Sequence, residues 1–137
     1  MPASTSVIVL SAALIVSKEG KLLLVRKRDT SFFMQAGGKI EISETPACAL
    51  MRELKEELNL VITPSQILHL GRFHAPAANE PGWTVEAELF HLSLDEDVAP
   101  ASEISEVAWV DPSGPIDLPL APLTRNAVIP FYLRTCS

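Results

Sequence analysis

The sequence predicts one α/β domain in which a pair of strands precedes an amphipathic helix, and further strands precede a second helix. Three observations support this class. Two apolar runs flank a polar turn near the N-terminus, a helical pattern spans residues 45–58, and strand-like runs resume after it. At 137 residues the chain has the length of one domain with one core, so we expect a single domain over residues 1–137.

Composition excludes several classes of protein. An apolar content of 47% with 20% charged residues argues against disorder. The net charge of −6 disfavours binding to nucleic acid or to an anionic membrane surface. No run reaches the ~18–20 apolar residues of a membrane-spanning helix, and the apolar N-terminal run lacks the positive start of a signal peptide. We therefore expect a cytoplasmic protein in which Cys48 and Cys136 are reduced thiols.

The first two apolar runs predict a β-hairpin. Ser6–Ser17 and Leu22–Val25 are separated by the polar turn Lys18–Lys21. The basic residues Arg26, Lys27 and Arg28 follow, and each by itself fits the solvated end of a strand. Phe32 and Phe33 come next, and core packing is favoured for them over stacking on a base.

The stretch from Gly37 to Leu60 predicts a glycine loop followed by a capped helix of about four turns. Gly37-Gly38 allows a tight turn or a close approach of the backbone to a ligand. Thr45 and Pro46 suit the N-cap and the first helical position, and Asn59 suits a left-handed end. One arc of the helix is apolar and is expected to pack on the core: Ala47, Leu50, Met51, Leu54 and Leu58.

The other face of this helix carries Glu53, Glu56 and Glu57. Like charges at this spacing repel by roughly 0.2–0.5 kcal/mol per pair, and the macrodipole disfavours anions near the C-terminal end. A hard divalent cation such as Mg²⁺ or Mn²⁺ removes both penalties. The charges alone leave a second interpretation open, a solvated acidic face that Arg52 and Lys55 partly compensate.

The rest of the chain predicts three more strands and a closing helix. The strands are Gln66–His74, Trp83–Leu94 and Glu106–Val110, with His74 and His91 in structural positions. The loop Ala75–Gly82 carries Asn79, and loops of this kind often shape specificity. Between and after the strands we expect an acidic connection, a Pro-rich linker and a helix with Pro130 near its end: Asp95–Ser105, Asp111–Leu120 and Leu123–Arg134.

The charged residues of the central stretch resemble the signature of the Nudix hydrolases, the MutT-like family. The match consists of Gly38, Glu44 and the run Arg52-Glu53-Leu54, one residue, Glu56-Glu57, one residue, Asn59-Leu60. The family has Gly where Asn59 stands, and usually Pro-Gly-Gly and Gly-Glu in place of Ala36-Gly37-Gly38 and Ser43-Glu44. All charged positions of the signature are present.

This resemblance implies a Nudix fold, a mixed β-sheet sandwiched between α-helices. It also implies a Mg²⁺-dependent hydrolase, with Mn²⁺ as a substitute, that cleaves phosphoanhydride bonds in a nucleoside diphosphate linked to another moiety. The implied metal ligands are Gly38, Glu53, Glu56 and Glu57. By the same resemblance Arg52 orients the carboxylates, Glu44 assists, and a further acid acts as base, with Glu103, Glu106 or a signature glutamate such as Glu53 as candidates.

The resemblance further places basic residues on the substrate's phosphates, for which Arg26, Arg28 and Lys39 are the candidates. Phe33, Asn79 and Trp83 are candidates for contact with the base or ribose. An ordinary or modified nucleoside triphosphate is the first expected substrate, and ADP-ribose is second because Pro76 has the spacing of a family marker. The alternative is a non-catalytic, regulatory Nudix module that binds nucleotides. The sequence leaves open whether two chains form a homodimer.

Overall fold

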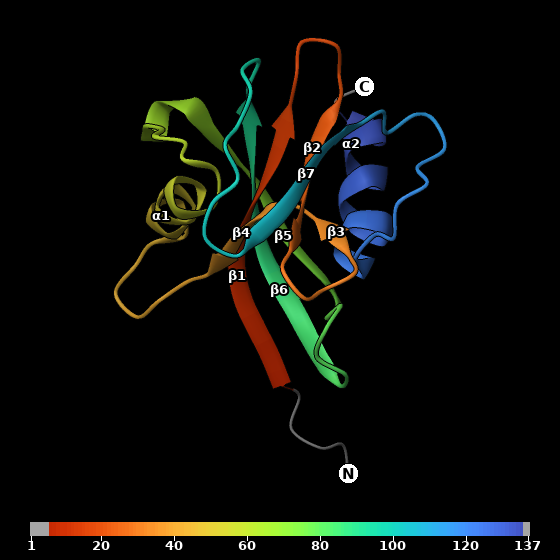
Figure 1. Cartoon of the computed structure of the whole chain (residues 1–137). Coiled ribbons are helices and arrows are strands. Elements are labelled where there is room, and N and C mark those ends of the chain that lie inside the picture. The colour runs from red at the N-terminus through yellow and green to blue at the C-terminus, as the bar shows by residue number, and fades with distance from the viewer. Residues whose placement is uncertain (1–5, 136–137) are drawn as a thin grey trace.

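A mixed sheet between helices forms the body of the protein, and it confirms the expected α/β class. The computed structural model describes residues 6–135, so Cys136 lies outside the described part. Helix α1 (Pro46–Leu58) lies on one side of the strands, and helix α2 (Ile129–Thr135) lies on the other (Figure 1). The central pair β1 and β6 is parallel, whereas the other pairs among the described strands are antiparallel.

The sheet branches at its first strand. The described strands are β1 Ser6–Val16, β2 Leu22–Lys27, β3 Phe33–Met34, β4 Ala36–Lys39, β5 Ile67–Pro76, β6 Trp83–Ser93 and β7 Ile104–Val110. β1 carries β6 and then β5 on one edge and pairs with β4 on the other, while β2 pairs with β3 and β7. The strands expected at 66–74, 83–94 and 106–110 correspond to β5, β6 and β7, with shifted ends.

The predicted N-terminal hairpin forms its turn, but its two strands separate at once. The only register pair between β1 and β2 in the described chain is Val16↔Leu22. A strand has two edges, and those of β1 are taken by β6 along its whole length and by β4 at Leu10–Ala13. β2 therefore pairs with β7 instead.

Helix α1 begins and ends as predicted. The Thr45 hydroxyl accepts a hydrogen bond from the Cys48 N–H at 3.1 Å, which caps the first turn. Asn59 has φ 56° and ψ 31°, the left-handed conformation that ends a helix. The predicted apolar arc packs on the sheet, with Leu50, Leu54 and Leu58 fully buried and Ala47 and Met51 partly buried beside them.

Two apolar cores lie on opposite faces of the sheet. On the α1 side Ala13 and Ile15 of β1 pack with the leucines of the helix. On the α2 side the alternate residues Ala12 and Leu14 pack with residues of the C-terminal helix such as Tyr132. Because successive side chains of a strand point to opposite faces, burial on both faces explains why this part of β1 is apolar throughout.

Gly37 and Gly38 lie in strand β4 and not in the predicted loop. They pair with Ala12 and Ser11 of β1. Gly37 has φ 149°, and a Cβ there would collide with the Ser11 carbonyl oxygen. The two glycines therefore serve close backbone packing within a sheet.

The C-terminal helix contains Pro130 near its start, not near its end as predicted. A π-helical turn, η2 (Thr124–Val128), precedes α2. Proline has no N–H to donate, and here the Ile129 N–H bonds to the Thr124 carbonyl five residues back. The wider turn accommodates the proline within one continuous helical segment.

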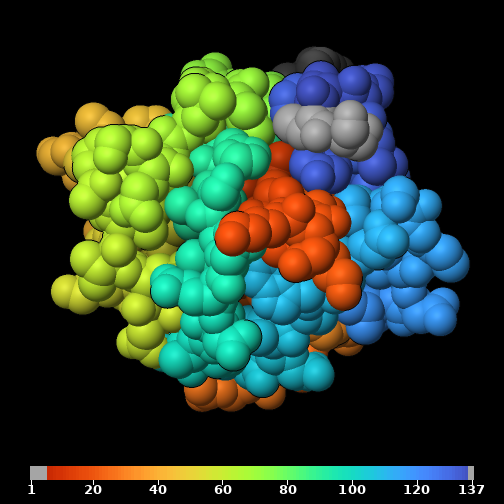
Figure 2. All heavy atoms as spheres, turned by 90° about the horizontal axis from the view of Figure 1, so that it is seen from above, coloured from red at the N-terminus to blue at the C-terminus, as the bar shows by residue number. Residues whose placement is uncertain are grey.

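The acidic connection and the Pro-rich linker both run over the surface, as expected. The connection begins after β6 and crosses beside the β1–β2 turn (Figure 2), where the Lys18 N–H donates to an Asp95 carboxylate oxygen at 2.7 Å. Within residues 6–135, no helix is long and apolar enough to cross a bilayer.

Leu54 has no exposed surface, so we expect Leu54→Ala to lower the free energy of unfolding by roughly 2–5 kcal/mol. Cys48→Ala is the matched control, because Cys48 lies on the same helix and is exposed; its effect should stay within about 0.5 kcal/mol. Urea denaturation followed by circular dichroism measures both. If both variants lost the same small amount of unfolding free energy, the face of α1 that carries Leu54 would not be buried.

Candidate active site

The acidic side of α1 lies against the two glycines of β4. A Cβ at Gly38 would collide with the Glu53 carboxyl group, whose atoms would lie within 2.8 Å of it. Only glycine therefore lets this carboxylate approach the β4 backbone so closely. The glycine pair and the helix acids thus form one unit, although the chain between them turns through residues 40–45.

Glu57 points inward and is 5% exposed. Its carboxylate accepts a hydrogen bond from the Gly37 N–H at 3.1 Å. The pKa of the Glu57 carboxyl is raised to about 7, mainly by burial and to a smaller extent by the charges of Glu53 and Glu103, against the opposing effects of the Gly37 N–H and Lys27. A carboxylate in this position is favoured only when positive charge is near.

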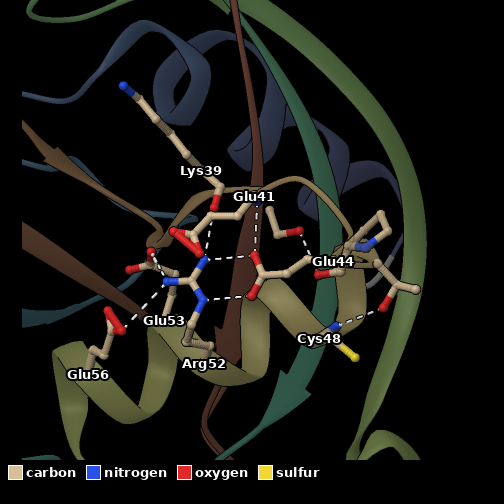
Figure 3. A network of polar contacts seen from close by, with 10 residues as sticks. Lys39, Glu41, Glu44, Cys48, Arg52, Glu53 and Glu56 are labelled. Carbon is tan, nitrogen blue, oxygen red and sulfur yellow. Dashed lines mark hydrogen bonds and ion pairs between the residues drawn. The ribbon is translucent and has the colours of Figure 1, made fainter.

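Arg52 is the centre of a network of ion pairs (Figure 3). Its guanidinium donates to both oxygens of Glu44 at 2.7 and 2.9 Å, to Glu53 at 2.9 Å and to the Lys39 carbonyl at 3.1 Å. Glu56 lies 3.6 Å away. The hydrogen bond from Arg52, with another from the Glu41 N–H, lowers the pKa of Glu44 to about 2. Glu44 and Arg52 therefore form a bidentate pair that links the loop after β4 to the helix.

The carboxylates of the three helix acids have different partners within the chain. In the described chain, no three His, Cys, Asp or Glu side chains are grouped to hold a metal ion. Arg52 attracts Glu53 and Glu56, while Glu57 turns toward Gly37. The chemistry of these donors fits a hard divalent cation, because carboxylate oxygens are its preferred ligands and the Glu53 carboxyl group lies against Gly38, where a Cβ would collide with it.

A cavity of about 240 Å³ opens on the opposite face of the same glycine strand. Gly37, Gly38 and Lys39 form part of its wall. Its other lining residues are mostly apolar and come from β1, β6, the loop after β5 and the start of the C-terminal segment: Ile8, Leu10, Ala12, Pro76, Ala78, Val85, Ala121 and Leu123. Asn79, a predicted substrate residue, also lines this cavity.

Phe33 and Trp83 do not line the cavity. Phe33 is 5% exposed and packs in the core on the α2 side, because β3 forms a bridge with Leu120. Trp83 starts β6 and is exposed to 44%. The structure thus supports the core interpretation of Phe33 and gives Trp83 no place at this cavity.

The three basic residues of β2 and its end have different surroundings. Arg26 forms an ion pair with Glu106 at 2.6 Å and donates to the Thr30 carbonyl, and Arg28 donates to the Ser102 carbonyl at 2.8 Å. Lys27, which was not among the predicted phosphate-binding residues, lines the cavity, and its charge lowers the pKa of Glu57. These different surroundings follow from the pairing of β2 with β7, which the sequence alone did not predict.

The same pairing separates the two candidate bases. Glu106 lies opposite Arg26 in the register and is held by it. Glu103 precedes β7, its carbonyl accepts from the Arg28 N–H, and its charge raises the pKa of Glu57. Glu103 is therefore the acid of this pair whose charge acts on Glu57.

Sequence reasoning missed Gln35 and Thr124. Gln35 lines the cavity, and its side chain accepts a hydrogen bond from the buried Thr124 hydroxyl at 2.8 Å. The two residues are 89 positions apart, and no local pattern marks either of them.

The raised pKa of Glu57 predicts how stability depends on pH in metal-free buffer. An acid whose pKa rises on folding, here from 4.5 to about 7, contributes fully below pH 4.5, and its contribution is lost as the pH rises to 7. Glu57→Gln removes this loss. We expect the variant to be more stable than the wild type at pH 8 by an amount on the order of 3 kcal/mol, with the difference vanishing near pH 4.

Chemical denaturation in the presence of a chelator, at a series of pH values, measures this difference. Glu56→Gln is the matched control, because Glu56 lies on the same helix with a side chain that is 51% exposed. A pH-independent gap between wild type and Glu57→Gln would contradict burial of an ionisable carboxyl at this position.

Comparison with known proteins gives the family. The model described as the NUDIX domain matches residues 8–129. The CTP pyrophosphohydrolase of Escherichia coli K12 is 30% identical over 126 residues, which cover 80% of this chain and 81% of that protein. The ADP-ribose pyrophosphatase of Methanocaldococcus jannaschii is 25% identical over 123 residues, which cover 88% of this chain and 70% of that protein.

A solved structure agrees with these sequence matches. The solution structure of the E. coli ORF135 protein superposes with a TM-score of 0.69 at 27% identity, covering 98% of this chain and 96% of that one. The glycine strand, the acidic helix and the Arg52 network described above occur within the matched region. The chain therefore belongs to the Nudix family and is a hydrolase that acts on pyrophosphate bonds in nucleoside diphosphate derivatives.

Proposed function

We propose that this protein hydrolyses a nucleoside triphosphate, ordinary or modified, to a nucleoside monophosphate and pyrophosphate. One observation carries the proposal: strand β4 has the acidic helix on one face and the cavity on the other. The Gly37 N–H donates to the Glu57 carboxylate. Gly37, Gly38 and Lys39 all line the cavity. A substrate whose base enters the cavity would therefore bring its phosphates to the acids of α1.

The cavity supports a nucleotide with one base. Its volume of about 240 Å³ lies just below the roughly 300–1,000 Å³ of pockets that enclose drug-sized ligands, so it suits a part of a nucleotide. The mostly apolar wall favours a planar base over a charged group. The match to a CTP pyrophosphohydrolase over 80% of the chain favours a triphosphate.

ADP-ribose is the second candidate substrate. Pro76, whose spacing suggested it, lines the cavity beside Asn79. A relative named as an ADP-ribose pyrophosphatase matches 88% of the chain. Both candidates share the diphosphate linkage that the site would cleave.

Nudix hydrolases generally use divalent metals, and we propose Mg²⁺, with Mn²⁺ as a substitute, held by Glu53, Glu56, Glu57 and the Gly38 carbonyl. The ion would neutralise phosphate charge and lower the pKa of a bound water. The raised pKa of Glu57 and the repulsion along the acidic face both favour a site that receives a cation.

The chain's own residues would position the substrate and move the proton. Arg52 and Glu44 would hold Glu53 in place through their bidentate pair. Lys39, at the end of β4, and Lys27, at the end of β2, would bind phosphate oxygens, because both line the cavity. Glu103 would accept the proton of the attacking water on its carboxylate.

We further propose that the protein works in the cytoplasm on small nucleotides and not on nucleic acid. The net charge of −6 would repel a polyphosphate backbone. A single small nucleotide meets only the local lysines of the cavity.

A nucleotide panel tests the reaction. We expect pyrophosphate release from at least one NTP, from 8-oxo-dGTP, or AMP release from ADP-ribose, only when Mg²⁺ or Mn²⁺ is present. Glu57→Gln should retain its fold and lose activity by orders of magnitude, whereas Glu41→Gln, an exposed acid before the helix, should remain active. If nucleotides raise the melting temperature but nothing is hydrolysed, the protein is a binding module.

A pair of substitutions identifies the general base. Glu103→Gln should lower kcat by roughly 10²–10⁴-fold. Glu106→Gln removes only an exposed ion pair with Arg26, so its kcat should stay near that of the wild type. The reverse ranking would assign the base to Glu106.

A further inference from the structure

Gln35 is a buried side chain with one unused donor. The residue is 6% exposed, and its Oε1 accepts a hydrogen bond from the Thr124 hydroxyl at 2.8 Å. Its Nε2 group is the buried side-chain nitrogen for which residues 6–135 supply no hydrogen-bond partner. A buried N–H without an acceptor loses its hydration and gains nothing in exchange, so such a group points to a partner from outside the chain.

The fold places this amide at the wall of the cavity. Gln35 stands between β3 and β4, where the chain passes from the partner of β2 to the partner of β1. It lines the cavity together with Met34 and Leu123. Phe33, two residues before Gln35, is bonded to the C-terminal segment by both its backbone groups: its N–H donates to the Pro119 carbonyl at 2.8 Å, and its carbonyl accepts from the Ala121 N–H at 3.0 Å.

Thr124 determines which end of the amide is available. Thr124 has no exposed surface and begins the π-helical turn η2. The Gln35 Oε1 accepts the Thr124 hydroxyl proton, which leaves the Nε2 group as the part of the amide available to a ligand.

We propose that Gln35 is a specificity-determining residue that donates its Nε2–H to an acceptor on the substrate's nucleobase, and that Thr124 is its positioning residue. The acceptor is a carbonyl oxygen or a ring nitrogen. A neutral amide in a mostly apolar wall suits a neutral acceptor, whereas phosphates are better matched by Lys27 and Lys39. The inference rests on the proposed function and deepens it.

The test compares a nucleoside triphosphate from the panel with ribose 5′-triphosphate, which has the same phosphates and no base. For Gln35→Met, a substitution of similar length, we expect KM for the nucleotide to rise roughly tenfold or more with little change in kcat. The ribose triphosphate should be affected little. Gln35→Glu should impair nucleotide use further, since a carboxylate offers no donor.

Two controls separate reading of the base from stability. Gln66→Met makes the same change at the chain's other glutamine, which is exposed in the turn Pro64–Gln66, and should leave KM unchanged. Thr124→Ser keeps the hydroxyl and should behave as the wild type, whereas Thr124→Val should resemble Gln35→Met. The ratio of the KM values for the nucleoside triphosphate and the ribose triphosphate is independent of the fraction of folded protein.

A measurement on the unaltered protein supplements the kinetics. The side-chain amide resonance of Gln35, assigned by its loss in Gln35→Met, should shift when the nucleotide binds and stay in place with pyrophosphate. If the wild type hydrolyses nucleotides but the ratio of KM values is the same in Gln35→Met, this inference is overturned and the proposed function stands. If the wild type hydrolyses no nucleotide and its amide resonance stays fixed, both fail.

Discussion

The close contact between helix α1 and the glycines of β4 is the constraint on which the site depends. Any side chain at Gly38 would collide with the Glu53 carboxyl, and any at Gly37 would collide with the backbone of β1. These two glycines let one strand approach a neighbouring strand and an acidic helix at the same time. The result is that Glu57 is buried with its carboxylate on a backbone N–H, an arrangement that would be costly in a protein without use for positive charge at this point.

Ion pairs with Arg52 explain how the chain tolerates the acidic face of α1 without a bound cation. Its guanidinium interacts with Glu44, Glu53 and Glu56, so three carboxylates share one internal cation. Glu57 lies outside this network and has the raised pKa. The division separates two kinds of acid on one helix. Those beside Arg52 share one guanidinium, whereas the buried Glu57 accepts a hydrogen bond from the Gly37 N–H.

The branching of the sheet brings the two halves of the site together. Because β1 has β4 on one edge and β6 on the other, β2 is directed to β7, and this brings Glu103 toward the buried end of α1. The same arrangement leaves a cavity on the far face of β4. The C-terminal segment contributes Ala121 and Leu123 to the wall of that cavity, and the π-helical turn before Pro130 contains Thr124, which donates a hydrogen bond to Gln35. The short strand β4 thus lies between the acids of α1 and the cavity.

The sequence by itself determined the helix, its caps, its buried arc and the identity of the family, because these depend on neighbouring residues and on fixed spacing. Thr45, Pro46 and Asn59 act on the residues beside them, and the charges of the signature recur at helical intervals. Only the tertiary structure decided that Glu106 pairs with Arg26 while the charge of Glu103 acts on Glu57, that Phe33 belongs to the core, and that Gln35 meets Thr124. Those outcomes depend on strand register and on contacts between distant segments. No local pattern encodes which strands pair with the two edges of β1, so the partners of these residues are known only from the assembled sheet.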